Sequence, residues 1–517
     1  MAIFDYFNLN GGMNRLANRM AIPPTEADWI DNLHWQNQQG WSNQNTGCKT
    51  MNPTNTLNNG ANIVSLFGFL DTYGVYQTLA QAGNQLYKID PLTGDILDTL
   101  GEVSSSPCQY TVILGWCIVV GKDKPPLRWN GQTALEPLPN WPPNLVDYVA
   151  GNPSLAATYA NRLILAGDPT FPNAVYISAN EDPETFTPNN ALEESAGAIQ
   201  VSPGDGQYIT ALVPMFVPYT NEQILLIFKN RSVYALKGNS ASDFTLQQVA
   251  NHVGAVSPKA VLTVGQEVWF LSEQGISSLG VNSQLGVLAL GNLSAKVQQL
   301  TSSLNRSQLH KAFAYHDITR QEVWWWVAEG SSNIPNRVWI QKNLEGNSVW
   351  SLRSGLSAYC GLALPTGELI TGTNGGVWHQ QRIGTTYNGS SIAWQYKTAP
   401  LSLGAASLSK RLSSVDLYLR QISQSSLTIN AEWDLGRSVT TPLTPTVDVG
   451  SNQQSNLYGQ AVYNLQNYNG SLSGVVRFFP DGTGSLFQLS LSGTLPLQPF
   501  TLEGFSFRTI EGGSVQL

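Results

Sequence analysis

The sequence predicts an all-β protein: a β-propeller of six or seven blades, with an N-terminal arm and a C-terminal antiparallel β-sandwich domain. Three observations lead to this fold class. Charged residues make up only 12% of the 517 residues, while the chain contains 47 Gly and 28 Pro, a composition unsuited to exposed helices. Apolar runs separated by polar turns recur along the middle of the chain. After Gln381 the pattern changes to an alternation of apolar and polar residues.

Residues 1–60 follow neither pattern, so we expect an arm that docks on another surface. A short helix is expected from Pro24 to about Leu33, because proline is favoured in the first turn of a helix. The segment has little core of its own, which makes its three tryptophans interaction candidates: Trp29, Trp35 and Trp41. The surface that they contact is either the chain's own propeller or a neighbouring subunit.

Residues 61–385 are expected to form the propeller with loop insertions. Each unit is an apolar run, a polar turn and a second apolar run, as in EQILLIFKNRSVYALKG (222–238). The turns are rich in Gly, Asn, Asp and Lys, because hairpin turns need positive φ angles. Unit centres lie about 30 to 60 residues apart, which fits propeller blades. They fall near Asp90, Lys122, Asp168, Lys229, Glu273, Ser331 and Asn374.

Two apolar runs favour blades over a series of β-sandwiches, which is the competing interpretation. The runs ILLIF (224–228) and VWFL (268–271) contain no polar alternation, so both of their faces should be buried. The middle strands of a propeller blade are packed between neighbouring blades and meet this requirement. A sheet with one wet face does not.

Residues 386–517 are expected to form a half-exposed antiparallel sandwich. Segments such as RLSSVDLYLRQ (411–421) and FTLEGFSFRTI (500–510) alternate with period two, so that one face is apolar and the other is polar. An insertion at 450–470 is rich in Asn, Gln, Tyr and Gly. It is too polar for a core, and we expect an ordered loop or a contact surface.

Four carboxylates flank two apolar runs in NRLILAGDPTFPNAVYISANEDPETFTP (161–188): Asp168, Glu181, Asp182 and Glu184. A catalytic acid cluster is one interpretation. Structural turns are favoured, because Gly-Asp-Pro and Asn-Glu-Asp-Pro are turn signatures and neither His nor Lys lies nearby in the sequence. The turn hypothesis requires Leu163–Leu165 and Val175–Ile177 to be adjacent antiparallel strands, with the carboxylates outside them.

The sequence predicts no catalytic residue, no cofactor and no metal site. His310 and His316 would lie about 20 Å apart on an extended strand, too far to share a metal ion. Phosphate-binding loops, dinucleotide fingerprints, nucleophile elbows and sialidase Asp-boxes are all missing from the sequence. Short Gly-rich turns at 204–207 and 480–485 leave calcium binding open.

The four cysteines contain no C-x-x-C pair: Cys48, Cys108, Cys117 and Cys360. Four buried free thiols are favoured over a disulfide between Cys108 and Cys117. Among the remaining aromatic residues, Trp324 and Trp326 are interaction candidates, because alternate residues of a strand share one face and could stack on a sugar ring. Filling an interface between blades is the favoured alternative for this pair.

The net charge of −8 and a pI near 5.2 argue against tight binding of nucleic-acid phosphates. Such a surface lets a DNA duplex pass without gripping it. The N-terminus shows no secretory signal, and no apolar run approaches the ~20 residues that a membrane-spanning helix needs. We therefore expect the chain to be made in a cytosol.

Several stretches together resemble the tail nozzle, or tail hub, proteins of short-tailed bacteriophages (podoviruses). The opening FNLNGGMN…IPPTEADWIDNLHWQNQQGW resembles the arm of that family. The segment NRLILAGDPTFPNAVYISANEDPETF (161–186) is similar to one of its blades, in which a strand ends in Gly-Asp and the next ends in a DPxxF turn. LLIFKNRSVYALKG (225–238) is similar to a succeeding blade. The resemblance covers roughly residues 8–385 and is loose beyond them.

The resemblance implies a structural protein of the virion, not an enzyme. It implies a homohexameric ring below the portal and the tail adaptor ring, with a needle or plug and tail fibres or spikes as further partners. This ring retains packaged double-stranded DNA and conducts it during ejection without specific binding. Six copies would carry a net charge of −48 (6 × −8), consistent with a lumen that does not grip DNA.

Two alternatives remain open at this point. One is a receptor- or glycan-binding propeller of a phage tail, in which Trp324 and Trp326 contact the sugar. The other is a glycan hydrolase with a propeller core, in which Asp168 and Glu184 act as the acids.

Overall fold

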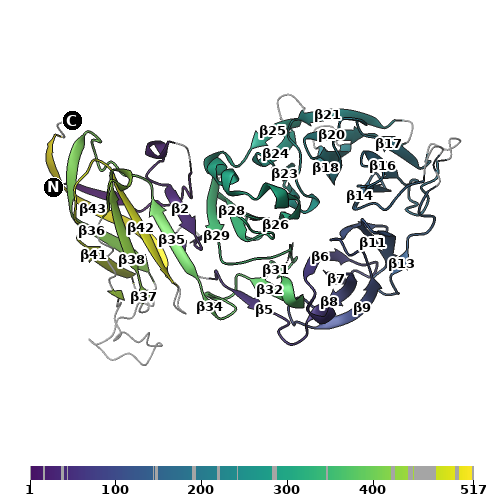
Figure 1. The fold of residues 1–517 in the computed structure, drawn as a ribbon, viewed down its shortest axis with the longest axis horizontal. Coiled ribbons are helices and arrows are strands. Elements are labelled where there is room, and N and C mark those ends of the chain that lie inside the picture. Colours follow the sequence, from purple (N-terminus) through teal and green to yellow (C-terminus); the bar gives the residue numbers. More distant parts are fainter. Residues whose placement is uncertain are drawn as a thin grey trace.

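The structure is a computed structural model. It describes residues 2–15, 18–36, 40–42, 45–143, 145, 149–188, 194–217, 222–240, 243–281, 288–344, 347–420, 425–439, 446–447, 473–494 and 500–514. The fold class expected from the sequence is confirmed, because the chain forms a β-propeller and an antiparallel β-sandwich side by side (Figure 1). Both termini lie at the sandwich end of the molecule (Figure 1). The insertion at 450–470 lies outside the described residues.

The described strands form seven propeller blades of four antiparallel strands each. Blades 1 to 4 consist of β6 (Ile63–Leu70), β7 (Tyr76–Ala82), β8 (Gln85–Ile89) and β9 (Ile96–Glu102); β10 (Gln109–Ile113), β11 (Trp116–Gly121), β12 (Lys124–Trp129) and β13 (Glu136–Pro137); β14 (Leu155–Tyr159), β15 (Arg162–Ala166), β16 (Ala174–Ile177) and β17 (Gly197–Gln200); and β18 (Ile209–Val217), β19 (Glu222–Lys229), β20 (Ser232–Lys237) and β21 (Thr245–Asn251).

Blades 5 to 7 consist of β22 (Val261–Val264), β23 (Glu267–Ser272), β24 (Gly275–Val281) and β25 (Leu288–Asn292); β26 (Phe313–Asp317), β27 (Glu322–Val327), β28 (Arg337–Leu344) and β29 (Asn347–Arg353); and β30 (Cys360–Ala363), β31 (Leu369–Gly372), β32 (Trp378–Gln381) and β5 (Cys48–Thr50). Two short strands, β33 (Thr386–Tyr387) and β34 (Ser390–Ser391), extend the sheet of blade 7. Each repeat unit found in the sequence corresponds to one blade, so the number of blades is seven.

The ring is closed by a strand from the N-terminal segment. β5 pairs with β32 and supplies the outer strand of blade 7, so residues far apart in the sequence complete one sheet. A second link crosses the ring from blade 5 to blade 1. Lys259, in the 3-10 helix η3 (Pro258–Ala260), donates a 2.6 Å hydrogen bond from Nζ to the carbonyl oxygen of Val64. Val64 lies where the register between β6 and β7 shifts, which leaves its carbonyl group available.

Burial explains why the apolar runs form central strands. In β19, Ile224 to Phe228 are all at most 1% exposed, although successive side chains point to opposite faces. One face packs toward blade 5, where Phe228 lies 5.0 Å from Phe270 between ring centroids. The other face joins the core between blades 3 and 4. The expectation of two buried faces is thus confirmed for this strand.

The sandwich consists of two sheets that pack face to face. One contains β3 (His34–Gln36), β4 (Gly40–Ser42), β43 (Thr501–Ser514), β36 (Leu408–Arg420), β41 (Ser473–Phe478) and, paired with β43, β1 (Ala2–Tyr6). The other contains β2 (Ala27–Asp31), β35 (Ala393–Thr398), β42 (Phe487–Thr494), β38 (Thr428–Trp433) and β39 (Ser438–Val439). Ring pairs such as Tyr396–Phe505, at 5.9 Å, fill the space between the sheets.

The N-terminal segment is divided between the two domains and does not form a separate arm. β1, β2, β3 and β4 belong to the sandwich, while β5 belongs to blade 7. The expected helix from Pro24 to about Leu33 is wrong, because residues 27–31 form strand β2. β2 pairs with β29 of blade 6 on one side and with β35 on the other. Hydrogen bonding on both sides outweighs the weak local preference for a helix.

The ring closure near Gly376 provides a test of the fold. Gly375 and Gly376 both have positive φ angles, +71° and +67°, but only a Cβ atom on Gly376 would meet the backbone, at 2.4 Å from the carbonyl oxygen of Leu57. We expect Gly375→Ala to lower the free energy of unfolding by about 1–2 kcal/mol through φ strain. Gly376→Ala should lower the free energy of unfolding by about 1–3 kcal/mol more than Gly375→Ala, through overpacking. Equal losses in chemical denaturation would contradict this account of the closure.

Candidate functional site

The joint between propeller and sandwich is the most extensively built polar site among the described residues. β2 continues the sheet of blade 6 into the sandwich, which produces one nine-stranded sheet across both domains. Two backbone hydrogen bonds anchor the N-terminal segment to β29. The Met13 N–H donates to the Trp350 carbonyl at 2.8 Å, and the Asn32 N–H donates to the Leu352 carbonyl at 2.9 Å.

Charged side chains reinforce the propeller side of this joint. Arg337 of β28 donates to Asp31 at 2.9 Å and to Glu329 at 3.1 Å, and its side chain is only 20% exposed. The guanidinium carbon of Arg337 also lies 5.9 Å from the centre of the Trp29 ring, and that of Arg15 lies 5.4 Å from the same ring. Burial raises the pKa of Asp31, and the attraction of Arg337 opposes this effect.

A second set of polar contacts holds the sandwich side. Asp28, 2% exposed, accepts hydrogen bonds from Arg15 at 2.9 Å and from Arg19 at 2.6 Å. Arg19 and Asp28 both contact Gln488 of β42. The Asn32 amide donates to the Ala393 carbonyl at 2.7 Å and to the Ser354 hydroxyl at 3.1 Å, so one side chain bridges the two domains.

The interaction candidates of the N-terminal segment all contact the chain itself. Trp41 is 1% exposed, donates from Nε1 to the Leu9 carbonyl at 2.8 Å, and meets Trp35 edge to face at 5.6 Å. Trp35 and Trp41 lie on β3 and β4 of the sandwich, whereas Trp29 lies at the joint. Their partners are therefore the chain's own sandwich and joint, and Trp41 is not available to a neighbouring subunit.

Trp324 and Trp326 are both 0% exposed and fill the core between blades 6 and 7. Phe313 stacks on Trp326 at 5.3 Å, and Tyr315 stacks on Trp324 at 5.7 Å. Neither indole ring presents a face to solvent, so this pair cannot form a sugar platform in the folded chain. The packing interpretation of the Trp triplet is the one that the structure supports.

The four carboxylates of residues 161–188 lie in turns outside the two strands. Ile164 pairs with Ile177 and Ala166 pairs with Val175, so the two strands are antiparallel neighbours as predicted. Asp168, 1% exposed, accepts from the N–H groups of Gly151 and Thr170 and from the Tyr176 hydroxyl. Asp182 accepts from the Glu184 N–H at 3.0 Å, and Glu184 pairs with Arg128. A buried Asp168 with its oxygens engaged is a poor general acid or base.

Metal ligands do not gather among the residues that the structure describes, where no group of three or more His, Cys, Asp or Glu side chains could hold an ion. His310 lies in the 3-10 helix η5 (Arg306–Lys311), whereas His316 lies in β26. The described helices include none that is long and apolar enough to cross a membrane.

All four cysteines are free and buried, as the sequence predicts. Burial raises the pKa of the Cys108 thiol to about 12 and that of Cys360 to about 11, so both stay protonated near neutral pH. We expect no thiol to react with an aromatic disulfide reagent at pH 8 in the native protein, and four to react after unfolding in guanidinium. A rapidly reacting thiol in the native protein would contradict the buried positions.

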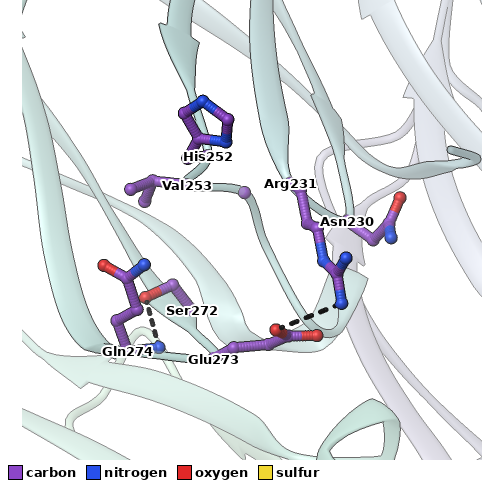
Figure 2. Close-up of a pocket in the computed structure, with 8 residues that line it drawn as sticks. Asn230, Arg231, His252, Val253, Ser272, Glu273 and Gln274 are labelled. Atoms are coloured by element: carbon purple, nitrogen blue, oxygen red, sulfur yellow. Dashed lines mark hydrogen bonds and ion pairs between the residues drawn. The ribbon is translucent and has the colours of Figure 1, made fainter. Parts of the chain in front are cut away.

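A shallow groove of about 220 Å³ lies between blades 4 and 5. Figure 2 shows Arg231 and Glu273 pointing toward each other from the turns of these blades, with His252 above them. The Arg231–Glu273 pair is 3.8 Å apart, and its side chains are 64% and 44% exposed. The groove is smaller than the ~300–1,000 Å³ of small-molecule sites. It is polar but holds no nucleophile paired with a base.

A buried charge cluster between blade 6, blade 7 and β3 was not anticipated from the sequence. Glu322, 1% exposed, pairs with Arg382, lies 3.4 Å from Lys342, and accepts from the Trp324 indole at 3.2 Å. Burial, together with repulsion from Arg320, lowers the pKa of Arg382 to about 10. Its members lie far apart in the sequence, and only the fold brings them together.

His34 lies at the edge of this charge cluster. Burial lowers its pKa well below the usual value, and the positive charges of Arg382 and Arg353 act in the same direction. The imidazole is therefore neutral at physiological pH. Its Nδ1 atom is buried and has no hydrogen-bond partner among the described residues.

No protein-family model matches the chain, and no curated protein matches it. Similar solved structures include the WD40 β-propeller domain of Doa1, with 10% identity, a TM-score of 0.38, and coverage of 65% of this chain and 96% of that one. YCF48 from Cyanidioschyzon merolae has 12% identity, a TM-score of 0.39, and coverage of 65% and 98%. The computationally designed Ika8 protein has 13% identity, a TM-score of 0.34, and coverage of 62% and 100%.

These likenesses concern the fold alone, and the seven-bladed ring of the described strands itself defines the class. The chain is a β-propeller protein with an attached β-sandwich. What this two-domain body does is a matter for proposal.

Proposed function

We propose that the chain is a structural subunit of a ring-shaped tail nozzle of a short-tailed bacteriophage. The ring lies below the portal and the adaptor, closes the channel to retain packaged DNA, and conducts the DNA during ejection. Six copies form the ring, and needle or plug and fibre or spike proteins bind to it. The role is structural rather than enzymatic. The sequence stretches that resemble the tail nozzle family motivate this proposal.

The observation that carries the proposal is the nine-stranded sheet that runs from blade 6 through β2 into the sandwich. Separate domains are usually joined by a linker and move relative to each other. Here backbone hydrogen bonds, ion pairs and one continuous apolar core join them, and that core includes Trp339 of blade 6, Ile30 of β2 and Phe505 of the sandwich. A rigid two-domain body suits the wall of a channel that withstands internal pressure.

The glycan hydrolase alternative loses support, because Asp168 is buried and Glu184 is paired with Arg128. The glycan-binding alternative loses its tryptophan platform but keeps the groove between blades 4 and 5 as a specific feature. Binding on a glycan array that disappears in Arg231→Ala would favour it, because Arg231 is exposed and lines that groove.

A test of DNA retention follows from the proposal. In a phage that encodes this chain, particles assembled without it should package DNA and then lose it to added nuclease. Supplying the chain during assembly should restore nuclease-resistant DNA and infectivity. Particles that retain their DNA and infect normally without the chain would overturn the proposal.

A further inference from the structure

A second cavity, of about 150 Å³, lies between blades 6 and 7. Three segments line it: the turn between β26 and β27 with Thr319 and Arg320, the turn between β30 and β31, and the end of β32 with Gln381 and Arg382. Two arginines therefore line one small cavity. It adjoins the Glu322 charge cluster, because Arg382 belongs to both.

Two of the lining side chains are deeply buried and carry polar atoms without partners among the described residues. The Arg382 side chain is 6% exposed and its Nε–H donates to nothing there. Gln381 is 3% exposed, and its Oε1 accepts nothing. A buried polar group without a partner is unfavourable, so such groups usually have a water or ligand partner.

Hydrogen bonding to neighbouring residues fixes the orientation of the Gln381 amide. The Thr371 hydroxyl donates to the His379 carbonyl at 3.5 Å, so its oxygen is free to accept a hydrogen bond. The Gln381 Nε2 donates to that oxygen at 2.8 Å. This arrangement leaves the side-chain carbonyl oxygen of Gln381 without a hydrogen-bond partner among the described residues. One unpaired acceptor therefore lies beside the cationic donors.

The charges around the cavity do not balance. Four cations lie in the cluster and at the cavity: Arg320, Lys342, Arg353 and Arg382. Asp317 pairs with Arg320, Glu322 pairs with both Arg382 and Lys342, and Glu368 lies at the cavity, which leaves an excess of one positive charge (4 − 3). Arg353 is 3% exposed, and two of its nitrogen atoms have no partner in the described part of the chain. Local positive charge is notable in a chain whose net charge is −8.

We propose that this cavity binds inorganic hydrogen phosphate, which keeps a hydroxyl group at neutral pH. Arg320 and Arg382 would donate to the phosphate oxygens, because a guanidinium matches phosphate geometry and forms strong charge-assisted hydrogen bonds. The phosphate hydroxyl would donate to the unmatched Gln381 oxygen. Sulfate has the same shape and charge sign but no hydroxyl, so it would leave that acceptor unpaired.

The test is calorimetric titration of the purified full-length chain at constant ionic strength with three probes: inorganic phosphate, sulfate and adenosine 5′-monophosphate. We expect one saturable phosphate site per chain and at least tenfold weaker binding of sulfate. The phosphate monoester of the nucleotide is mainly a dianion without a hydroxyl near neutral pH, so we expect it to bind as weakly as sulfate. Binding of the nucleotide as tight as that of phosphate would contradict the role of the Gln381 oxygen.

Two variants and a matched control isolate the site. Arg320→Gln, at a side chain 40% exposed, should weaken phosphate binding at least tenfold. Gln381→Met should retain oxyanion binding but remove the preference for phosphate over sulfate. Arg231→Gln removes the same charge from the other groove and should bind phosphate like the wild type. Circular dichroism and unfolding midpoints verify the fold of each variant.

Three outcomes would overturn the phosphate site: no saturable phosphate binding, equal affinity for sulfate, or wild-type binding by folded Arg320→Gln. Each is measured on the purified chain whatever its oligomeric state. Failure of this inference is therefore distinguishable from failure of the tail nozzle proposal, which concerns assembly and DNA retention.

Discussion

Replacing Trp325 by alanine is expected to lower the free energy of unfolding by about 3–5 kcal/mol, the usual cost of truncating a fully buried Trp. Trp325 is 0% exposed and belongs to the core that is continuous from blade 5 through β2 to the sandwich. Its removal leaves a cavity that close-packed neighbours on several strands fill only partly. Chemical denaturation followed by intrinsic fluorescence and circular dichroism measures the loss.

Two controls separate packing from other effects at this position. Trp325→Phe should cost much less than alanine, because it keeps most of the ring volume and removes a buried indole N–H that has no partner among the described residues. Ile318→Ala, at a side chain 77% exposed on a turn of the same blade, should change stability by no more than about 0.5 kcal/mol. A small effect of Trp325→Ala would contradict the continuous core.

Glu322→Gln is also expected to lower the free energy of unfolding by about 3–5 kcal/mol, because it removes the carboxylate of a buried ion pair and leaves its partners charged. The side chains of Glu322 and Arg382 are 2% and 6% exposed, and Lys342 is the third member. The glutamine has nearly the same shape, so the loss measures charge rather than volume. Shifts of the denaturation midpoint at constant slope would report it.

The matched control is Glu102→Gln on the surface of blade 1. Glu102 pairs with Lys124 at 2.8 Å, but its side chain is 57% exposed, and exposed pairs contribute little. This variant should unfold close to the wild type. Equal losses of stability in the two variants would show that the buried Glu322 charge cluster does not depend on the Glu322 carboxylate.

Local pattern was sufficient to predict the propeller repeat. Unit centres such as Lys229 and Glu273 fall where the second strand of a blade turns into the third. These turns were predictable because a tight turn between two apolar runs depends only on residues that are adjacent in the sequence. The roles of Asp168 and Asp182 were predictable for the same reason, since turn chemistry depends on immediate neighbours. The alternation of β36 and β43 likewise marked the sandwich.

Long-range pairing was not predictable from one sequence. β5 is three residues long, and only its position beside β32 shows that it closes the ring. β2 follows Pro24, a residue that favours the start of a helix, yet two neighbouring strands make it extended. Arg382 and Glu322 are separated by 60 residues, so no motif spacing could indicate their pairing. Sites of this kind arise from topology, which one-dimensional patterns do not contain.

The most direct test of the proposed tail nozzle role is imaging of the purified chain by electron microscopy, alone and with the tail adaptor protein that the proposal requires. The account predicts closed rings of six copies, each copy a rigid body of propeller and sandwich in one fixed relative orientation. Particles that stay monomeric under both conditions, or domains that vary freely in relative orientation, would contradict it.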